Sequence, residues 1–252
     1  MDPLTSCALP VVLVPGLGLG RESWSPTVRA LLRSGTLDRG LVRTVLLPGY
    51  GLPGRSRRAL TPPVLARAVV VDLDHGAPAL LVGLSAGCQV AAHVALQAPD
   101  RVAGLVLVGP TTDPRADSWP RLVRRWVATA RSEPIRQLPA LLRQYRRTGP
   151  LTMLRAMDAA RRDRVEEVLP LLTCPTLVLR GAHDRIAPED WISSLAECVP
   201  DRARDGSVLR RWVTLAAGAH MVPFTHGDLV ARAVRDFVAD LGDRSSQAGS
   251  GW

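Results

Sequence analysis

A serine flanked by glycines follows a short apolar run in this chain, and its setting suits a nucleophile. The run at 79–82 leads into Gly83-Leu84-Ser85-Ala86-Gly87, and a helical pattern continues over 89–96. On so tight a strand-to-helix turn a serine adopts strained backbone angles, and the two glycines carry no Cβ that would collide with the strand or the helix. The turn exposes the Ser85 hydroxyl, and the Ala86 N–H can point at an oxyanion formed by acyl transfer. An ordinary structural serine in a glycine-rich turn is the alternative, so the assignment depends on partner residues.

A histidine in a loop of small residues is the best candidate for the base. A serine hydroxyl needs a base within hydrogen-bond reach and a carboxylate that orients this base. Of the five histidines, His220 lies in Ala217-Gly218-Ala219-His220-Met221, directly after the last expected strand. An imidazole there can reach across the strand ends, so we expect His220 to be the base.

Two aspartates could supply the carboxylate. Asp184 ends the run Leu177-Val178-Leu179-Arg180-Gly181-Ala182-His183-Asp184, in a tight turn after a strand. Asp113 follows the preceding strand, a position from which some serine hydrolases supply the acid. The chain order Ser, Asp, His with the acid one strand later favours Asp184. Asp113 is better placed to cap the start of the next segment.

The segments that position these residues alternate between strand and helix, which predicts an α/β fold with a mostly parallel sheet and helices on both faces. Strands are expected at 10–14, 43–47, 79–84, 103–108, 176–180 and 209–215. Helices are expected at about 25–34, 62–73, 89–96, 188–198 and 228–241. This order places Ser85, Asp184 and His220 at the same carboxyl-terminal edge of the sheet.

One long segment interrupts this alternation and is helical throughout. We expect a core at 1–110 and 174–241, a helical cap inserted at 111–173, and a flexible Gly/Ser-rich tail at 242–252. The cap carries apolar stripes at helical spacing, such as Leu122, Val123, Trp126 and Val127. Some apolar side chains must face the site although each could equally belong to the interior of the cap. The candidates for the substrate pocket are Trp126, Tyr145, Met153, Met157 and Met221.

Composition narrows the class of protein. The chain has 252 residues, 46% of them hydrophobic, and a formal charge of +9. All of its basic residues are arginines, dispersed along expected helices rather than gathered with aromatic residues, so no nucleic-acid partner is expected. The absence of lysine excludes Schiff-base catalysis and a lysine-dependent phosphate loop. No apolar segment long enough for a membrane, no secretion signal and no metal-binding cysteine spacing is visible, so we expect a cytoplasmic protein without metal or cofactor.

Together these motifs resemble the α/β-hydrolase superfamily. The resemblance rests on Pro15-Gly16-Leu17-Gly18, on the turn at Ser85, on Gly181 to Pro188, and on Gly218-Ala219-His220. It implies that the Leu17 amide is a second oxyanion donor beside Ala86. Because only about nine residues precede the first expected strand, we expect the antiparallel strands of larger members to be missing and the sheet to have about six strands. The chain departs from the family in having Pro15 where a histidine usually begins the first turn, which leaves the backbone donor intact.

The function that the resemblance implies is a serine hydrolase that cleaves a small-molecule carboxylic ester or lactone with Ser85, His220 and Asp184. The same triad also serves C–C bond hydrolysis or cyclisation in secondary metabolism. Cleavage of a thioester on an acidic carrier protein is a further alternative, motivated by cap arginines 121, 124, 125, 143, 146 and 147. A non-catalytic ligand-binding protein of the same fold is the alternative from another class.

Overall fold

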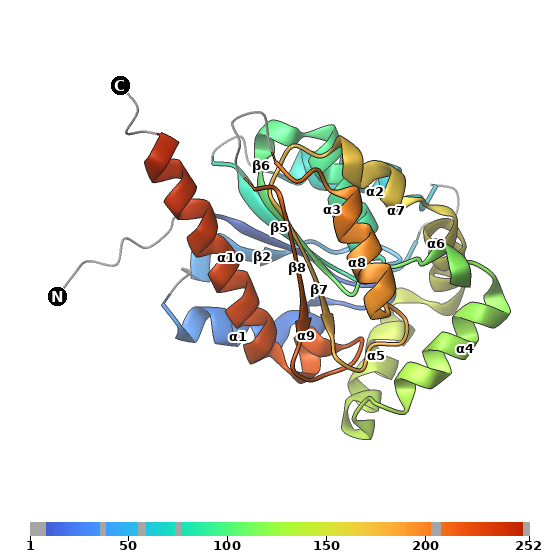
Figure 1. Cartoon of the computed structure of the whole chain (residues 1–252). Coiled ribbons are helices and arrows are strands. Elements are labelled where there is room, and N and C mark those ends of the chain that lie inside the picture. Colours follow the sequence, from blue (N-terminus) through green and yellow to red (C-terminus); the bar gives the residue numbers. More distant parts are fainter. Residues whose placement is uncertain (1–8, 36–38, 55–58, 74–76, 203–207, 249–252) are drawn as a thin grey trace.

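A parallel sheet forms the centre of the molecule. The computed structural model describes residues 9–35, 39–54, 59–73, 77–202 and 208–248. Its six-stranded sheet has the order β2-β1-β5-β6-β7-β8, and every neighbouring pair is parallel (Figure 1). The strands are β1 (Val11–Val14), β2 (Val42–Thr44), β5 (Ala79–Leu84), β6 (Val102–Val108), β7 (Thr176–Gly181) and β8 (Arg210–Leu215). The predicted fold class and strand number are confirmed.

Both faces of the sheet are buried along its four inner strands, whose successive side chains point into two different cores. One core contains Val11, Leu80, Val106 and Leu177, and the other contains Val12, Leu81, Leu105 and Val178. The first core packs against α1 (Ser25–Arg33) and α10 (Gly227–Ala248), which lie side by side. The second packs against α2 (Pro62–Asp72), α3 (Gly87–Gln97) and α8 (Glu189–Cys198), on the opposite side of the sheet in Figure 1.

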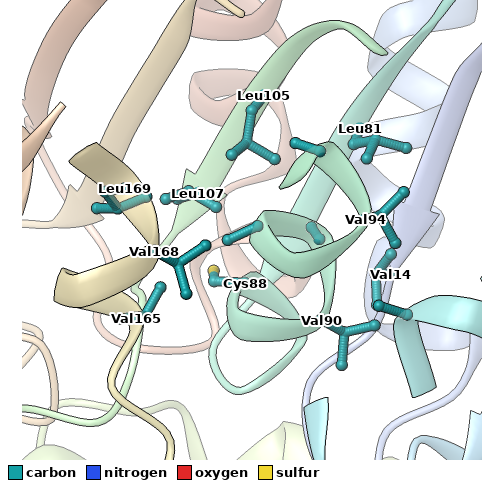
Figure 2. Packing of buried hydrophobic residues seen from close by; sticks show 14 of the residues in the cluster. Val14, Leu81, Cys88, Val90, Val94, Leu105, Leu107, Val165, Val168 and Leu169 are labelled. Carbon is teal, nitrogen blue, oxygen red and sulfur yellow. The ribbon is translucent and has the colours of Figure 1, made fainter. Parts of the chain in front are cut away.

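Helix α3 is the most enclosed helix of the second core. Its side chains Cys88, Val90 and Val94 are fully buried and belong to one core with Leu81 and Leu105 of the sheet (Figure 2). Burying side chains of this size stabilises a fold by about 1.5–3 kcal/mol each. This packing fixes the start of α3, and with it the turn that carries Ser85.

The predicted insertion is helical. It contains α4 (Trp119–Ala130), α5 (Leu138–Thr148), α6 (Pro150–Arg162) and α7 (Val165–Val168), with 3-10 turns at Pro114–Ala116, Ile135–Gln137 and Leu169–Leu171. Helices α4, α5 and α6 lie together beyond one end of the sheet, whereas α7 packs against α3 (Figures 1 and 2). The cap range 111–173 stays a prediction, and its last part contributes to the core beneath α3.

Two polar contacts hold α5 on the first turn of the core. The buried Gln144 Oε1 accepts a hydrogen bond from the Gly20 N–H at 2.7 Å, and Thr148 Oγ1 donates to the Gly18 carbonyl at 3.1 Å. Because a buried polar group without a partner is costly, these contacts also fix the orientation of α5. The cap is therefore seated directly on the turn that carries Leu17.

Some boundaries differ from the sequence prediction. The edge strand ends at Thr44 instead of 47, and the chain then forms a small sheet of β3 (Leu47–Pro48) and β4 (Gly51–Leu52) around Gly49, whose φ is +85°. Remaining short elements are 3-10 turns at Arg21–Trp24, Arg39–Leu41 and Pro99–Arg101 and helix α9 (Val222–Thr225).

The last helix also runs beyond its predicted end. Helix α10 continues to Ala248, so the expected flexible tail at 242–252 is helical in its first part, and 249–252 lie outside the described residues. A glycine within a helix costs only about 1 kcal/mol relative to alanine, so Gly242 does not end the helix.

None of the helices in the described part of the chain is both long and apolar enough to cross a membrane.

Candidate active site

Ser85 stands on a sharp turn between β5 and α3. Its φ of +55° makes it the one non-glycine residue with a positive φ among the described residues. A Cβ on Gly83 would lie 2.7 Å from the Cα of Cys88, and a Cβ on Gly87 would lie 2.8 Å from the Val14 carbonyl oxygen. Both positions therefore require glycine, and the strained angle at Ser85 lifts its hydroxyl away from the backbone.

His220 joins Ser85 to Asp184. Its Nε2 lies 2.8 Å from Ser85 Oγ, and its Nδ1 lies 2.8 Å from Asp184 Oδ2. Asp184 is completely buried, and its other oxygen, Oδ1, accepts hydrogen bonds from the Ile186 and Ala187 amides at 2.9 Å each. The carboxylate is thus fixed on one side by backbone and presented to the imidazole on the other. This arrangement suits a base that accepts the proton of the Ser85 hydroxyl.

Arg180, near the end of β7, lies beneath the turn that carries Asp184 and forms hydrogen bonds with it. This arginine is only 5% exposed, and its guanidinium donates to the Ala187 carbonyl at 3.0 Å and to the Asp184 carbonyl at 2.8 Å. The sequence prediction gave it no role. An arginine inside an otherwise apolar strand was the available signal, because a buried charge must be paired or hydrogen-bonded.

The alternative acid, Asp113, has other partners. Its carboxylate is buried and lies 2.7 Å from both Arg115 and Arg125, and it also accepts the Arg115 N–H at 2.9 Å as the cap of the 3-10 turn at 114–116. Burial raises the pKa of Asp113, but the two arginines outweigh this effect and hold its pKa below the usual value. The geometry pairs His220 with Asp184 and leaves Asp113 to the two arginines.

The surroundings of His220 favour its protonated form. Burial by itself lowers the pKa of the imidazole, but the negative charge and hydrogen bond of Asp184, together with the charge of Glu133, outweigh burial and raise the pKa. A base whose charged form is stabilised is well suited to hold a proton transiently during acyl transfer.

Two backbone amides are available for an oxyanion. Leu17 and Ala86 both line the cavity beside Ser85. Within the described residues the N–H of neither one has a protein acceptor, whereas the neighbouring Gly18 N–H donates to the Gly49 carbonyl at 2.7 Å. Ala86 also precedes the first turn of α3, where the helix dipole favours negative charge. Both predicted donors are therefore free to stabilise an oxyanion.

A cavity of about 360 Å³ separates the cap from the Ser85 turn. Four of the predicted pocket residues line it, namely Trp126, Tyr145, Met157 and Met221. Met153 does not. It packs one helical turn away, where a Cβ on Gly18 would lie 2.7 Å from Met153 Cε. Residues 153 and 157 share a face of α6, but Met157 lies one turn closer to the C-terminal end of the helix, where its side chain lines the cavity.

Much of the cavity wall is the apolar face of α4, which the sequence showed as a stripe without revealing its direction. Further lining residues that the prediction did not include are Leu19, Thr111, Thr112, Trp119, Leu122, Val123, Val127, Ala130, Leu141, Ala160, Arg161 and Ile186. Spacing of three and four residues along 119–130 was the available signal. Whether such a face turns toward the site or into the interior of the cap depends on tertiary packing.

Apart from His220, Arg161 is the one ionisable cation among the residues that line this cavity. Its guanidinium is already engaged, because it donates to Asp158 Oδ1 at 2.9 Å and to the Asp117 carbonyl at 3.2 Å, and lies 5.5 Å from the centre of the Trp119 ring. The wall around Ser85 is otherwise largely apolar. Among the described residues, no group of three or more His, Cys, Asp or Glu side chains is arranged to hold a metal ion.

Comparison with known proteins identifies the family of this chain. A model of the Alpha/beta hydrolase family matches residues 11–233. The pimeloyl-[acyl-carrier protein] methyl ester esterase of Sodalis glossinidius is 30% identical over 260 residues, covering 90% of this chain and 92% of the relative. The enzyme of the same name from Xanthomonas oryzae pv. oryzae is 27% identical, covering 92% and 95%. The solved structure of a hydrolase from Oleispira antarctica superposes with a TM-score of 0.70 at 15% identity, covering 92% of this chain and 91% of the other. The chain therefore belongs to the alpha/beta hydrolase family and is a hydrolase.

Proposed function

We propose that this hydrolase cleaves small-molecule carboxylic esters or lactones, with Ser85 as nucleophile, His220 as base and Asp184 as the orienting carboxylate. The observation that carries the proposal is the continuous chain of hydrogen bonds from Ser85 Oγ through His220 to Asp184 Oδ2, each 2.8 Å long. The esterases among its relatives support the same class of reaction.

The geometry supports the following sequence of steps. Ser85 Oγ bonds to the carbonyl carbon while its proton passes to His220 Nε2, and the Leu17 and Ala86 amides hold the resulting oxyanion. The tetrahedral intermediate then breaks the bond to the leaving alkoxide, which takes the proton from His220. Water next transfers a proton to His220 and adds to the acyl-enzyme carbon. The Ser85–acyl bond breaks, and Ser85 Oγ recovers its proton.

The cavity supports a substrate with an apolar portion next to the ester. Trp126, Val127 and Met157 contribute largely hydrocarbon surface, and Arg161 is occupied by Asp158. Burial of an apolar group there gains about 0.8 kcal/mol for each CH₂. A carboxylate or ammonium group on the same part of the substrate would lose its hydration without gaining a free partner.

The test compares Ser85→Ala with Ser194→Ala, a control that replaces an exposed serine on α8. With p-nitrophenyl hexanoate, Ser85→Ala should lower turnover by roughly a millionfold if the three residues act as a unit. Labelling by a fluorophosphonate probe should disappear in Ser85→Ala and persist in Ser194→Ala. Retention of hydrolysis and labelling by Ser85→Ala would refute the proposal.

Esters carried by an acidic carrier protein are a second candidate substrate. Both curated relatives described above are named for an acyl-carrier-protein ester. Of the six cap arginines considered, Arg125 and Arg147 are paired with Asp113 and Glu22. The other four are exposed and form no ion pair among the described residues, namely Arg121, Arg124, Arg143 and Arg146. Exposed arginines without an ion-pair partner attract an acidic partner in a salt-dependent manner.

Charge reversal separates the two candidates. Arg143→Glu combined with Arg146→Glu should weaken kcat/KM for an acyl-carrier-protein methyl ester and leave a free methyl ester unaffected. Arg67→Glu, on the exposed side of α2, is the control and should change neither value. Equal rates of the double variant and the wild type on the carrier-bound ester at low salt would rule out a docking role for these arginines. The cytoplasmic location and the role in secondary metabolism stay predictions.

A further inference from the structure

The end of α4 and the turn after it contact the two loops that carry Asp184 and His220. Thr129 Oγ1 accepts a hydrogen bond from the Arg185 N–H at 3.1 Å, and Glu133 Oε1 accepts one from the Met221 N–H at 2.8 Å. Each donor amide belongs to the residue that directly follows a member of the proposed triad. The cap is thus hydrogen-bonded to the core at the backbone positions next to Asp184 and His220.

Glu133 is itself fixed in place. Its second oxygen, Oε2, accepts a hydrogen bond from Gln137 Nε2 at 2.7 Å, and Gln137 is only 5% exposed. The carboxylate therefore has one oxygen on the cap side and the other on the His220 loop. Fixing the Met221 amide also fixes the start of α9, the short helix that follows His220.

The charge of Glu133 reaches the cavity. Together with the burial of its ring, this charge raises the pKa of Tyr145 to about 12, and together with Asp184 it raises the pKa of His220 against the opposing effect of burial. Asp184 acts on the imidazole from the turn after β7, and Glu133 acts from the turn after α4. Tyr145 of α5 and Arg161 of α6 also line the cavity onto which His220 opens, and Arg161 is paired with Asp158.

We propose that Glu133 is a positioning residue for His220, which holds the backbone of the base loop and stabilises the protonated imidazole during acyl transfer. The inference rests on the proposed function, because it assigns His220 the role of base. A carboxylate supplied by the inserted cap, in addition to Asp184, would make the basicity of His220 depend on the seating of the cap.

Two substitutions separate the charge of Glu133 from its hydrogen bonds. Glu133→Gln keeps an oxygen that can accept the Met221 N–H. Its new amide N–H₂ can donate to Gln137 Oε1 after a flip of the Gln137 amide, because this oxygen is buried without a partner. Glu133→Ala removes the charge and both contacts. Glu167→Gln is the matched control, since Glu167 is 75% exposed and lies 3.9 Å from Arg164 on the surface.

The pH profile of kcat/KM for p-nitrophenyl hexanoate is the first measurement. In Glu133→Gln the acid limb should move to lower pH, with the plateau within about threefold of wild type. In Glu133→Ala the acid limb should move in the same direction. The plateau should also fall by about tenfold to a hundredfold, because the loop that carries His220 loses its hydrogen bond to the cap. Glu167→Gln should match the wild type in both respects.

NMR titration of the His220 ring in a Ser85→Ala background is the second measurement, and it needs no activity. Adding Glu133→Gln should lower the pH of the His220 transition. A transition and an acid limb unchanged in both Glu133 variants would overturn the inference, as would a loss of plateau without any shift, which indicates a merely structural role. Activity retained by Ser85→Ala alone would instead overturn the proposed function.

Discussion

Gly109 lies directly against Asp184: a Cβ at position 109 would be 3.0 Å from Asp184 Oδ2, and it would also be 3.3 Å from His220 Nδ1. Gly109 directly follows the last residue of β6 and has a φ of +54°, and its N–H donates to the Leu179 carbonyl at 2.7 Å. Asp184 and His220 are therefore packed against bare backbone, with no room for another side chain at position 109.

Gly109→Ala should consequently impair catalysis as well as stability. An alanine at positive φ costs about 1–2 kcal/mol, and its Cβ would push the Asp184 carboxylate out of line with the imidazole. Urea unfolding and kcat/KM for a p-nitrophenyl ester measure the two effects. Gly35→Ala is the control, because Gly35 has a φ of +66° and no atom within 4 Å of its added Cβ. It should lose similar stability and keep its activity; equal activity of both variants would contradict the expected displacement.

Asp184→Asn and Asp113→Asn should have opposite consequences. The first leaves His220 in the wrong tautomer and should reduce kcat by about ten-thousandfold with little change in fold. The second leaves Arg115 and Arg125 without their shared carboxylate, so it should lower the free energy of unfolding and spare most of the activity. Thermal unfolding and steady-state kinetics of both variants provide the comparison. A larger loss of kcat in Asp113→Asn would make Asp113 the acid.

The raised pKa of His220 predicts the direction of the pH dependence. In the proposed mechanism the neutral imidazole of His220 is the base, so kcat/KM should fall as the pH drops through a value above about 6.5, the ordinary pKa of histidine. The same shift stabilises the folded state fully below the ordinary pKa, and this contribution is lost as the pH rises through the folded-state pKa. A rate profile between pH 5 and 9 tests the assignment, and an acid limb below the ordinary histidine value would contradict it.

Met157 and Met153 should affect substrate choice differently. Met157→Ala enlarges the cavity and should shift preference among p-nitrophenyl esters toward longer acyl chains by about tenfold. Met153→Ala should leave the chain-length preference unchanged, because Met153 packs on Gly18 outside the cavity. The ratio of kcat/KM values for butyrate and decanoate esters measures the effect. The same shift in both variants would mean that the cavity wall extends to Met153.

The core and the placement of Ser85, Asp184 and His220 followed from local patterns in the sequence. Buried parallel strands are short apolar runs, and the glycines around Ser85 and before His220 mark turns at the carboxyl ends of these strands. The direction of the cap helices could not be predicted, because Met153 and Met157 are identical in type and differ only in how far along α6 they lie. Glu133 and Thr129 carried no sequence signal, since their role depends on a contact with loops far along the chain.

The two buried faces of the sheet restrict how the length of this chain can change during evolution. Adding or deleting one residue inside β5 or β6 would exchange the side chains that face α10 with those that face α3, and would disrupt both layers at once. Loops after the strands face no such restriction, because they leave the sheet at its carboxyl edge. Lengthening of the β6–β7 connection can therefore add wall to the cavity and change which substrates fit, while the strands that hold Ser85 and Asp184 keep their register.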